Sequence, residues 1–65
     1  MRLDSIKIKL LLAEMEITQS ELAKRCGISR QNISTMLLRG TCYAANAGRL
    51  AKALGVSVRE IIKEE

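Results

Sequence analysis

Helix-start signals recur at short intervals along this chain. Thr18 and Glu21 have the spacing of a capping box, in which the threonine hydroxyl accepts from the Glu21 amide and the Glu21 side chain reaches back. Ser57 and Glu60 repeat the same spacing. Two further N-cap candidates are Asp4 and Ser29. So many starts within 65 residues predict a series of short helices.

Glycines mark where several of these helices end. Gly27, Gly40 and Gly55 each follow a helical stretch, and a glycine there readily adopts the left-handed conformation that closes a helix. The starts and ends together predict five helices, at about residues 5–15, 19–26, 30–38, 44–54 and 58–63. We therefore expect an all-α fold, a compact five-helix bundle forming one domain over residues 1–65, because so short a chain has no room for a second core.

Residues 19–38 have the pattern of two helices joined by a tight turn. The turn is Gly27-Ile28-Ser29, and Ala23 is a small residue where the two helices must cross. Larger apolar residues form the seam between them: Leu22, Ile28, Ile33 and Met36. A small residue at the crossing, a permissive turn and an apolar seam specify a helix-turn-helix.

Three runs of residues carry a resemblance to a known family. They are Thr18-Gln19-Ser20-Glu21-Leu22-Ala23-Lys24-Arg25, Gly27-Ile28-Ser29-Arg30 and Leu50-Ala51-Lys52-Ala53-Leu54-Gly55-Val56-Ser57. Over about residues 8–62 the chain resembles the Cro/C1-type (XRE-like) phage and bacterial repressors. The resemblance implies a lambda-repressor-like DNA-binding domain of five helices. It also implies sequence-specific binding of double-stranded DNA, usually as a dimer on a two-fold operator, and control of transcription.

The segment after the second helix of the motif departs from the family pattern. Family members commonly reach the loop glycine about one residue sooner, whereas residues 35–40 here form a longer and more apolar run. Residues 42–46 also lack the proline often found in this loop. We therefore expect the loop at residues 39–46 to follow an unusual path.

The helix predicted at residues 30–38 is the candidate recognition helix. The N-terminal part of the second helix of a helix-turn-helix reaches base edges in the major groove. Arginine and glutamine side chains suit guanine and adenine edges through paired hydrogen bonds. The predicted base contacts are Arg30, Gln31, Asn32, Ser34 and Thr35. The alternative is that these are solvated polar residues on a surface helix.

Residues on either side of this helix are predicted to contact phosphates. Gln19 starts the helix before it, where backbone amides and the helix dipole favour an anion, and the family resemblance assigns it a phosphate contact. Arg39, Thr41 and Tyr43 follow the recognition helix and could hold backbone phosphates without reading sequence. Arg39 could instead pair with an acid.

Charge and composition favour a polyanionic partner and exclude several classes. The formal charge is +4, and no acid occurs between Ala23 and Arg49. The chain has no histidine and no Gly-rich phosphate loop, so we expect no enzyme, no metal or other cofactor and no small-molecule ligand. It also lacks a signal-peptide pattern and an apolar run long enough to cross a bilayer. A cytoplasmic protein with no membrane contact is expected.

The two cysteines and the first predicted helix leave alternatives open. Cys26 is interpreted as a small core residue and Cys42, in the loop, as the better candidate for a redox role. Ile6 and Leu10 extend the apolar surface around the first helix, which is typical of a buried helix or an interface. The sequence does not identify the dimer surface.

The interpretation is a bacterial, phage or mobile-element transcriptional regulator, a repressor that binds DNA as a homodimer. Repression is favoured because occupancy alone can block a promoter. A transcriptional activator remains an alternative, as does an antitoxin-like protein-interaction module with the same fold. An architectural DNA bender is disfavoured, since the first four residues contribute only one cation, Arg2, toward a basic arm.

Overall fold

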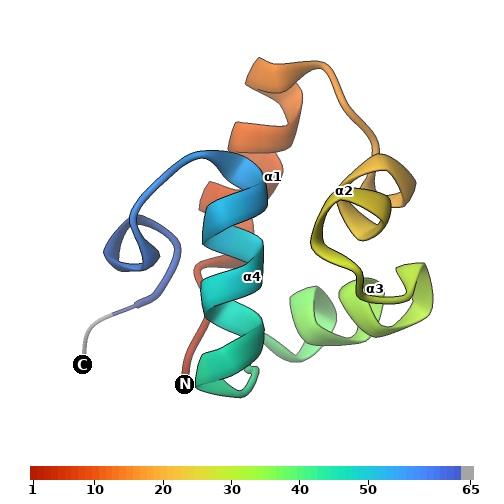
Figure 1. Cartoon of the computed structure of the whole chain (residues 1–65). Coiled ribbons are helices and arrows are strands. Elements are labelled where there is room, and N and C mark those ends of the chain that lie inside the picture. Colours follow the sequence, from red (N-terminus) through yellow and green to blue (C-terminus); the bar gives the residue numbers. More distant parts are fainter. Residues whose placement is uncertain (64–65) are drawn as a thin grey trace.

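The computed structural model describes residues 1–63, which form four α-helices and one 3₁₀ turn (Figure 1). The elements are α1 (Ser5–Met15), α2 (Gln19–Cys26), α3 (Arg30–Arg39), α4 (Ala44–Leu54) and η1 (Val58–Glu60). The four α-helices lie where the sequence predicts them, and α3 runs one residue further than expected. The all-α class is therefore confirmed, although the number of helices is not.

Side-chain caps start the first three helices at the predicted residues, but the capping box expected at Thr18 is half formed, since among residues 1–63 only its threonine bond is present. The Asp4 carboxylate accepts from the amide of Lys7 at 3.1 Å, and the Thr18 hydroxyl accepts from the amide of Glu21 at 3.2 Å. Ser29 caps α3 in the same way, accepting from the amide of Asn32 at 3.1 Å. Each cap satisfies an amide that the helix itself leaves without a partner.

The prediction of a fifth α-helix at residues 58–63 is wrong. The predicted capping box is formed: the Ser57 hydroxyl accepts from the Arg59 amide, and the Glu60 carboxylate accepts from the Ser57 amide. Only one 3₁₀ turn follows, ending at Glu60. Beyond it the carbonyl of Ile61 and the amide of Lys63 bond to the N-terminal part of the chain. Backbone groups used in this way are not available to extend a helix.

The first four residues form an extended segment that bonds to two distant parts of the chain. One is the loop after α3, and the other is residues 61–63. The Leu3 amide donates to the Gly40 carbonyl at 2.8 Å, and the Cys42 amide donates to the Met1 carbonyl at 2.9 Å. On the other side the Asp4 amide donates to Ile61 and the Lys63 amide donates to Arg2. Residues 1–4, called the N-terminal segment below, thus fix the loop after α3.

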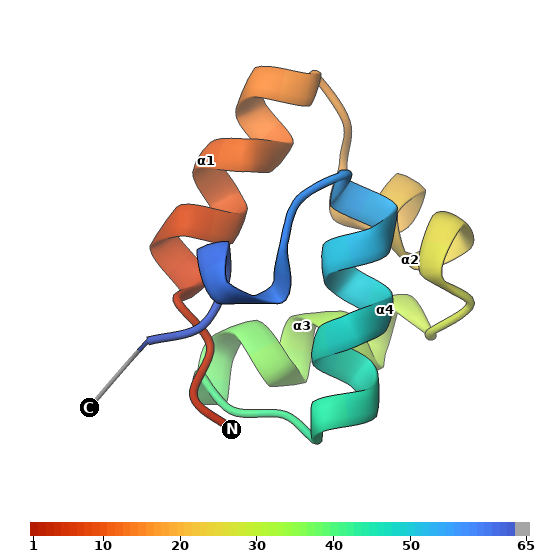
Figure 2. The ribbon, with the colours of Figure 1, turned by 60° about the vertical axis from the view of Figure 1, so that its left-hand side comes forward.

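One apolar core connects the elements. Its fully buried large side chains are Ile8, Leu22, Ile33, Leu50 and Ile61, one from each helix and one from the end of η1. α2 packs against both α3 and α4, and η1 packs against α4. Figure 2 shows α3 running across one end of the molecule, where its outer side is not covered by another helix.

None of the helices in the described part of the chain is long and apolar enough to cross a membrane.

Candidate nucleic-acid interface

The turn between α2 and α3 has the geometry of a helix-turn-helix. Gly27 closes α2 with a φ of 69°, and its amide donates to the Ala23 carbonyl at 2.9 Å. The Ile28 amide donates to the same carbonyl at 3.2 Å. Ala23 and the whole predicted seam are buried: Leu22, Ile28, Ile33 and Met36. The predicted motif is therefore present, and burial of one side of α3 leaves its other side to solvent.

The predicted base-contact residues lie on the solvent side of α3. Arg30, Gln31, Asn32 and Ser34 are exposed, and Thr35 is half-buried. The Thr35 hydroxyl donates to the Gln31 carbonyl one turn earlier at 2.9 Å. This bond occupies the hydroxyl proton within the helix, so the side chain can offer a methyl group and an acceptor oxygen but no free donor.

A side-chain hydrogen bond links the two helices of the motif on this side. The Ser34 hydroxyl donates to the Gln19 amide oxygen at 3.0 Å. Gln19 is the first residue of α2 and is half-buried. The bond fixes the Gln19 oxygen and leaves the hydrogens of its amide nitrogen as donors for an anion. In this arrangement Ser34 positions Gln19, a role that the sequence did not suggest.

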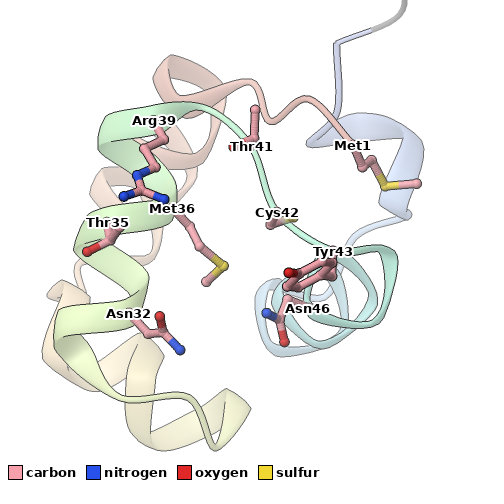
Figure 3. A pocket seen from close by; sticks show the side chains of 9 residues that line it. All are labelled: Met1, Asn32, Thr35, Met36, Arg39, Thr41, Cys42, Tyr43 and Asn46. Atoms are coloured by element: carbon pink, nitrogen blue, oxygen red, sulfur yellow. The ribbon is translucent and has the colours of Figure 1, made fainter.

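A groove of about 410 Å³ lies between α3 and the start of α4 (Figure 3). Asn32, Thr35 and Met36 come from α3, and Tyr43 and Asn46 stand on the opposite wall (Figure 3). The remaining lining residues are Met1, Arg39, Thr41 and Cys42. The groove thus brings together five predicted contacts: Asn32, Thr35, Arg39, Thr41 and Tyr43.

The walls of this groove provide cationic and amide donors. Arg39 is exposed at its edge, and among residues 1–63 it forms no ion pair with an acid. The alternative that Arg39 pairs with an acid is therefore not supported in the described part of the chain. α4 begins directly beside the groove, and its N-cap Tyr43 provides no side-chain hydrogen bond. The first amides of α4 are consequently available to an anion such as a DNA phosphate.

Two residues of this surface were not among the predicted contacts. Asn46 lies in the first turn of α4 and lines the groove. Leu38 lies near the end of α3 and is 89% exposed. Leu38 comes seven residues after Gln31, so the two lie on the same side of a helix. This spacing is visible in the sequence and could have identified Leu38 as a contact.

The environment of Cys42 does not activate its thiol. Burial raises the pKa of the Cys42 thiol, outweighing the N-terminal ammonium and the Ala47 amide, which lower it. A raised pKa keeps this thiol protonated and slow to react near neutral pH. The Cys26 thiol is half-buried against the core and donates weakly to the Ala23 carbonyl at 3.8 Å. Both thiols are free, and Cys26 fits the predicted role of a small core residue.

A buried α2–α3 seam with an uncovered polar side on α3 defines a helix-turn-helix DNA-binding domain. The model of one family, the Cro/C1-type HTH DNA-binding domain, matches residues 7–65. The chain belongs to this family, which confirms the resemblance seen in its sequence. No match was found among the curated proteins or the solved structures.

Proposed function

We propose that this chain represses transcription by binding a specific double-stranded DNA sequence as a homodimer, with α3 in the major groove. One observation carries the proposal: the N-terminal half of α3 presents Arg30, Gln31 and Asn32 to solvent from a helix-turn-helix of the Cro/C1-type family. These are the side chains that distinguish base pairs by hydrogen bonds in the major groove. The charge of +4 suits the same partner.

The site residues divide into two roles in this proposal. The proposed base-reading residues are Arg30, Gln31, Asn32, Ser34 and Thr35. Ser34 also holds the Gln19 side chain. Phosphates are held on both sides of α3. Gln19 holds them on one side, and Arg39, Thr41 and Tyr43 on the other. Phosphate contacts on both sides of α3 would fix the direction of the helix in the groove. Base contacts at one end of the helix alone would leave this direction free.

Repression and dimerisation rest on simpler arguments. A protein that occupies a promoter blocks it without contacting polymerase, so DNA binding is sufficient for repression in the cytoplasm. Two copies related by a two-fold axis would place their α3 helices about 34 Å apart, one turn of the duplex. The operator would then be an inverted repeat.

A second candidate function, docking of a partner protein, is favoured by the outer side of α1. Ile6 and Leu10 are 69% and 57% exposed there, one turn apart. Two adjacent exposed side chains of this size suit a small apolar contact. An antitoxin-like module or an activator that contacts polymerase would use such a surface.

Selection of bound duplexes from a random library by the purified protein, at two salt concentrations, tests the proposal. We expect an inverted repeat with half-site centres about one helical turn apart, retained at the higher salt. Recovery of no motif, with binding that disappears as salt rises, would show electrostatic binding only and would contradict sequence reading. A motif with a single half-site, bound by a protein that sediments as a monomer, would contradict the homodimer alone.

A further inference from the structure

Leu38 is the most exposed large hydrophobic residue of the described chain, at 89%. Single exposed leucines are common and carry no function by themselves. The position of this one is informative, because residues 31, 35 and 38 of a helix share one side. The buried residues of α3 lie on the other side: Ile33, Met36 and Leu37. Leu38 therefore extends the row formed by Gln31 and Thr35.

The length of α3 allows Leu38 to reach the same groove. At 1.5 Å per residue, Leu38 lies about 10 Å along the helix from Gln31. This distance corresponds to about three base pairs along the duplex. A helix that places Gln31 on one base pair thus brings Leu38 close to another about three pairs away.

The surface beside Leu38 is continuous with the proposed DNA interface. A second groove passes Leu38, and Arg39 and Thr41 line both this groove and the one in Figure 3. The other charged residues that line it are Arg2 and Lys63, and no acid is among its lining residues within the described chain. Arg2 has an interaction of its own, so we consider only the cations Arg39 and Lys63. Cations in the groove that an apolar side chain lines suit a partner that is apolar at one point and anionic beside it.

We infer that Leu38 contacts the 5-methyl group of a thymine and sets the preference at that base pair. Leucine offers no hydrogen bond, and the thymine methyl is the apolar group that the major groove presents. Phosphates on either side of the thymine lie toward Arg39 and the second groove. This inference rests on the proposed function and adds one specificity-determining residue to it.

Replacement of single thymines by deoxyuridine tests the inference, since it removes the methyl group and keeps every base-pairing hydrogen bond. The duplex is the motif selected by the wild-type protein, and affinities are measured for wild type, Leu38→Ala and Ile6→Ala. At one thymine per half-site, about three base pairs from the position read by Gln31, we expect deoxyuridine to weaken wild-type binding about fourfold, as for loss of one buried methyl-sized group. Leu38→Ala should bind both duplexes equally.

Ile6→Ala is the matched control. Ile6 is also exposed and lines the same second groove, but it belongs to α1. It should keep the wild-type ratio between thymine and deoxyuridine. Because Leu38 is exposed and alanine is a strong helix former, Leu38→Ala should fold as wild type does.

Three outcomes would overturn the inference. If Leu38→Ala keeps the wild-type ratio at every thymine, another residue reads the methyl group, while sequence-specific binding still stands. If Leu38→Ala and Ile6→Ala both reduce the sedimenting mass, the two residues form a protein interface instead. If wild type selects no motif at all, the proposed function fails and the inference fails with it.

Discussion

The α2–α3 unit and the loop after α3 both belong to the proposed DNA-binding surface, but different interactions hold them in place. The unit is fixed by caps and turns within a few residues, such as Thr18 with Glu21 and Gly27 with Ala23, and by the buried seam. The loop is fixed from far along the chain. Its Cys42 amide bonds to the Met1 carbonyl, and its Gly40 carbonyl accepts from the Leu3 amide.

This difference separates two tasks of the surface. The locally fixed unit presents the residues proposed to read bases. Arg39, the last residue of α3, and Thr41 and Tyr43 of the distantly fixed loop are proposed to hold phosphates. Substitutions in the unit should therefore affect folding and sequence preference, whereas substitutions that loosen the loop should affect affinity for all sequences.

Leu22→Ala destabilises the α2–α3 unit and should cause the largest change in stability. Leu22 is fully buried between α2 and the rest of the core, so truncation leaves a cavity. We expect a loss of about 2–5 kcal/mol in the free energy of unfolding, measured by urea denaturation. Ile6→Ala, at an exposed position, should stay within about 0.5 kcal/mol of wild type. Equal stability of the two variants would show that the seam does not hold the unit together.

Arg30→Ala tests the reading task without disturbing the seam, because Arg30 is exposed. It should cost roughly 1–3 kcal/mol in binding to the selected duplex and relax the preference at one base pair. Affinities for a panel of single-base variants of that duplex measure both effects. Lys24→Ala removes a charge from α2 and should leave the ranking of the panel unchanged. An unchanged ranking for Arg30→Ala as well would count against base reading.

Ser5→Ala sharpens the comparison from the loop side. The Ser5 hydroxyl donates to the Leu37 carbonyl at 2.6 Å and thereby joins the start of α1 to the end of α3. Loss of this bond should cost about 1 kcal/mol of stability, measured by denaturation. Affinity should fall by the same factor for duplexes that differ at the base pair assigned to Arg30. Ser20→Ala, at an exposed position on α2, is the stability control. A change in preference at the base pair assigned to Arg30 with Ser5→Ala would contradict the separation of tasks.

Arg39→Ala tests the phosphate task directly. It should weaken binding to all sequences alike and reduce the slope of log affinity against log salt by about one phosphate contact. Arg59→Ala, on η1, removes the same charge elsewhere on the surface. The assignment fails if both variants have the wild-type slope.

The smallest effect is expected at Cys42. Because burial raises the pKa of its thiol, iodoacetamide should react with it more slowly in the folded protein than in the unfolded chain. The raised pKa means that the folded state favours the neutral thiol. Its contribution to stability is present below the ordinary thiol pKa and is lost as pH rises through the higher folded value. Alkylation rates over about pH 7–9 in a Cys26→Ser background measure this, and a faster folded rate would contradict it.

The fold was predictable wherever its causes are local. Caps at Asp4, Thr18 and Ser29 gave the starts of α1, α2 and α3, and the left-handed glycines marked the ends of later helices. The fifth helix failed for the opposite reason. Its capping box is present, but the backbone of residues 61–63 pairs with the N-terminal segment about 60 residues away. No local pattern reports such a pairing.

In the candidate site, too, features with local causes were predictable and features that depend on distant contacts were not. The sequence indicated that the polar residues Arg30, Gln31 and Asn32 would be exposed, because a buried seam determines the opposite side of a helix, but Leu38 was missed. It did not indicate that Ser34 would bond to Gln19, since this contact depends on how closely two helices pack. The unusual path expected for residues 39–46 stays a prediction, whereas the bonds of this loop to Met1 and Leu3 are contacts that no local pattern indicated.

The bond between Ser34 and Gln19 constrains how the preference of this protein could change during evolution. Under the proposed function, Ser34 lies among the base-reading residues while Gln19 anchors a phosphate, so a substitution at position 34 alters both. A new operator could be reached through position 30 or 31 in a single step. A route through position 34 would first lose the anchor and would need a compensating change at position 19.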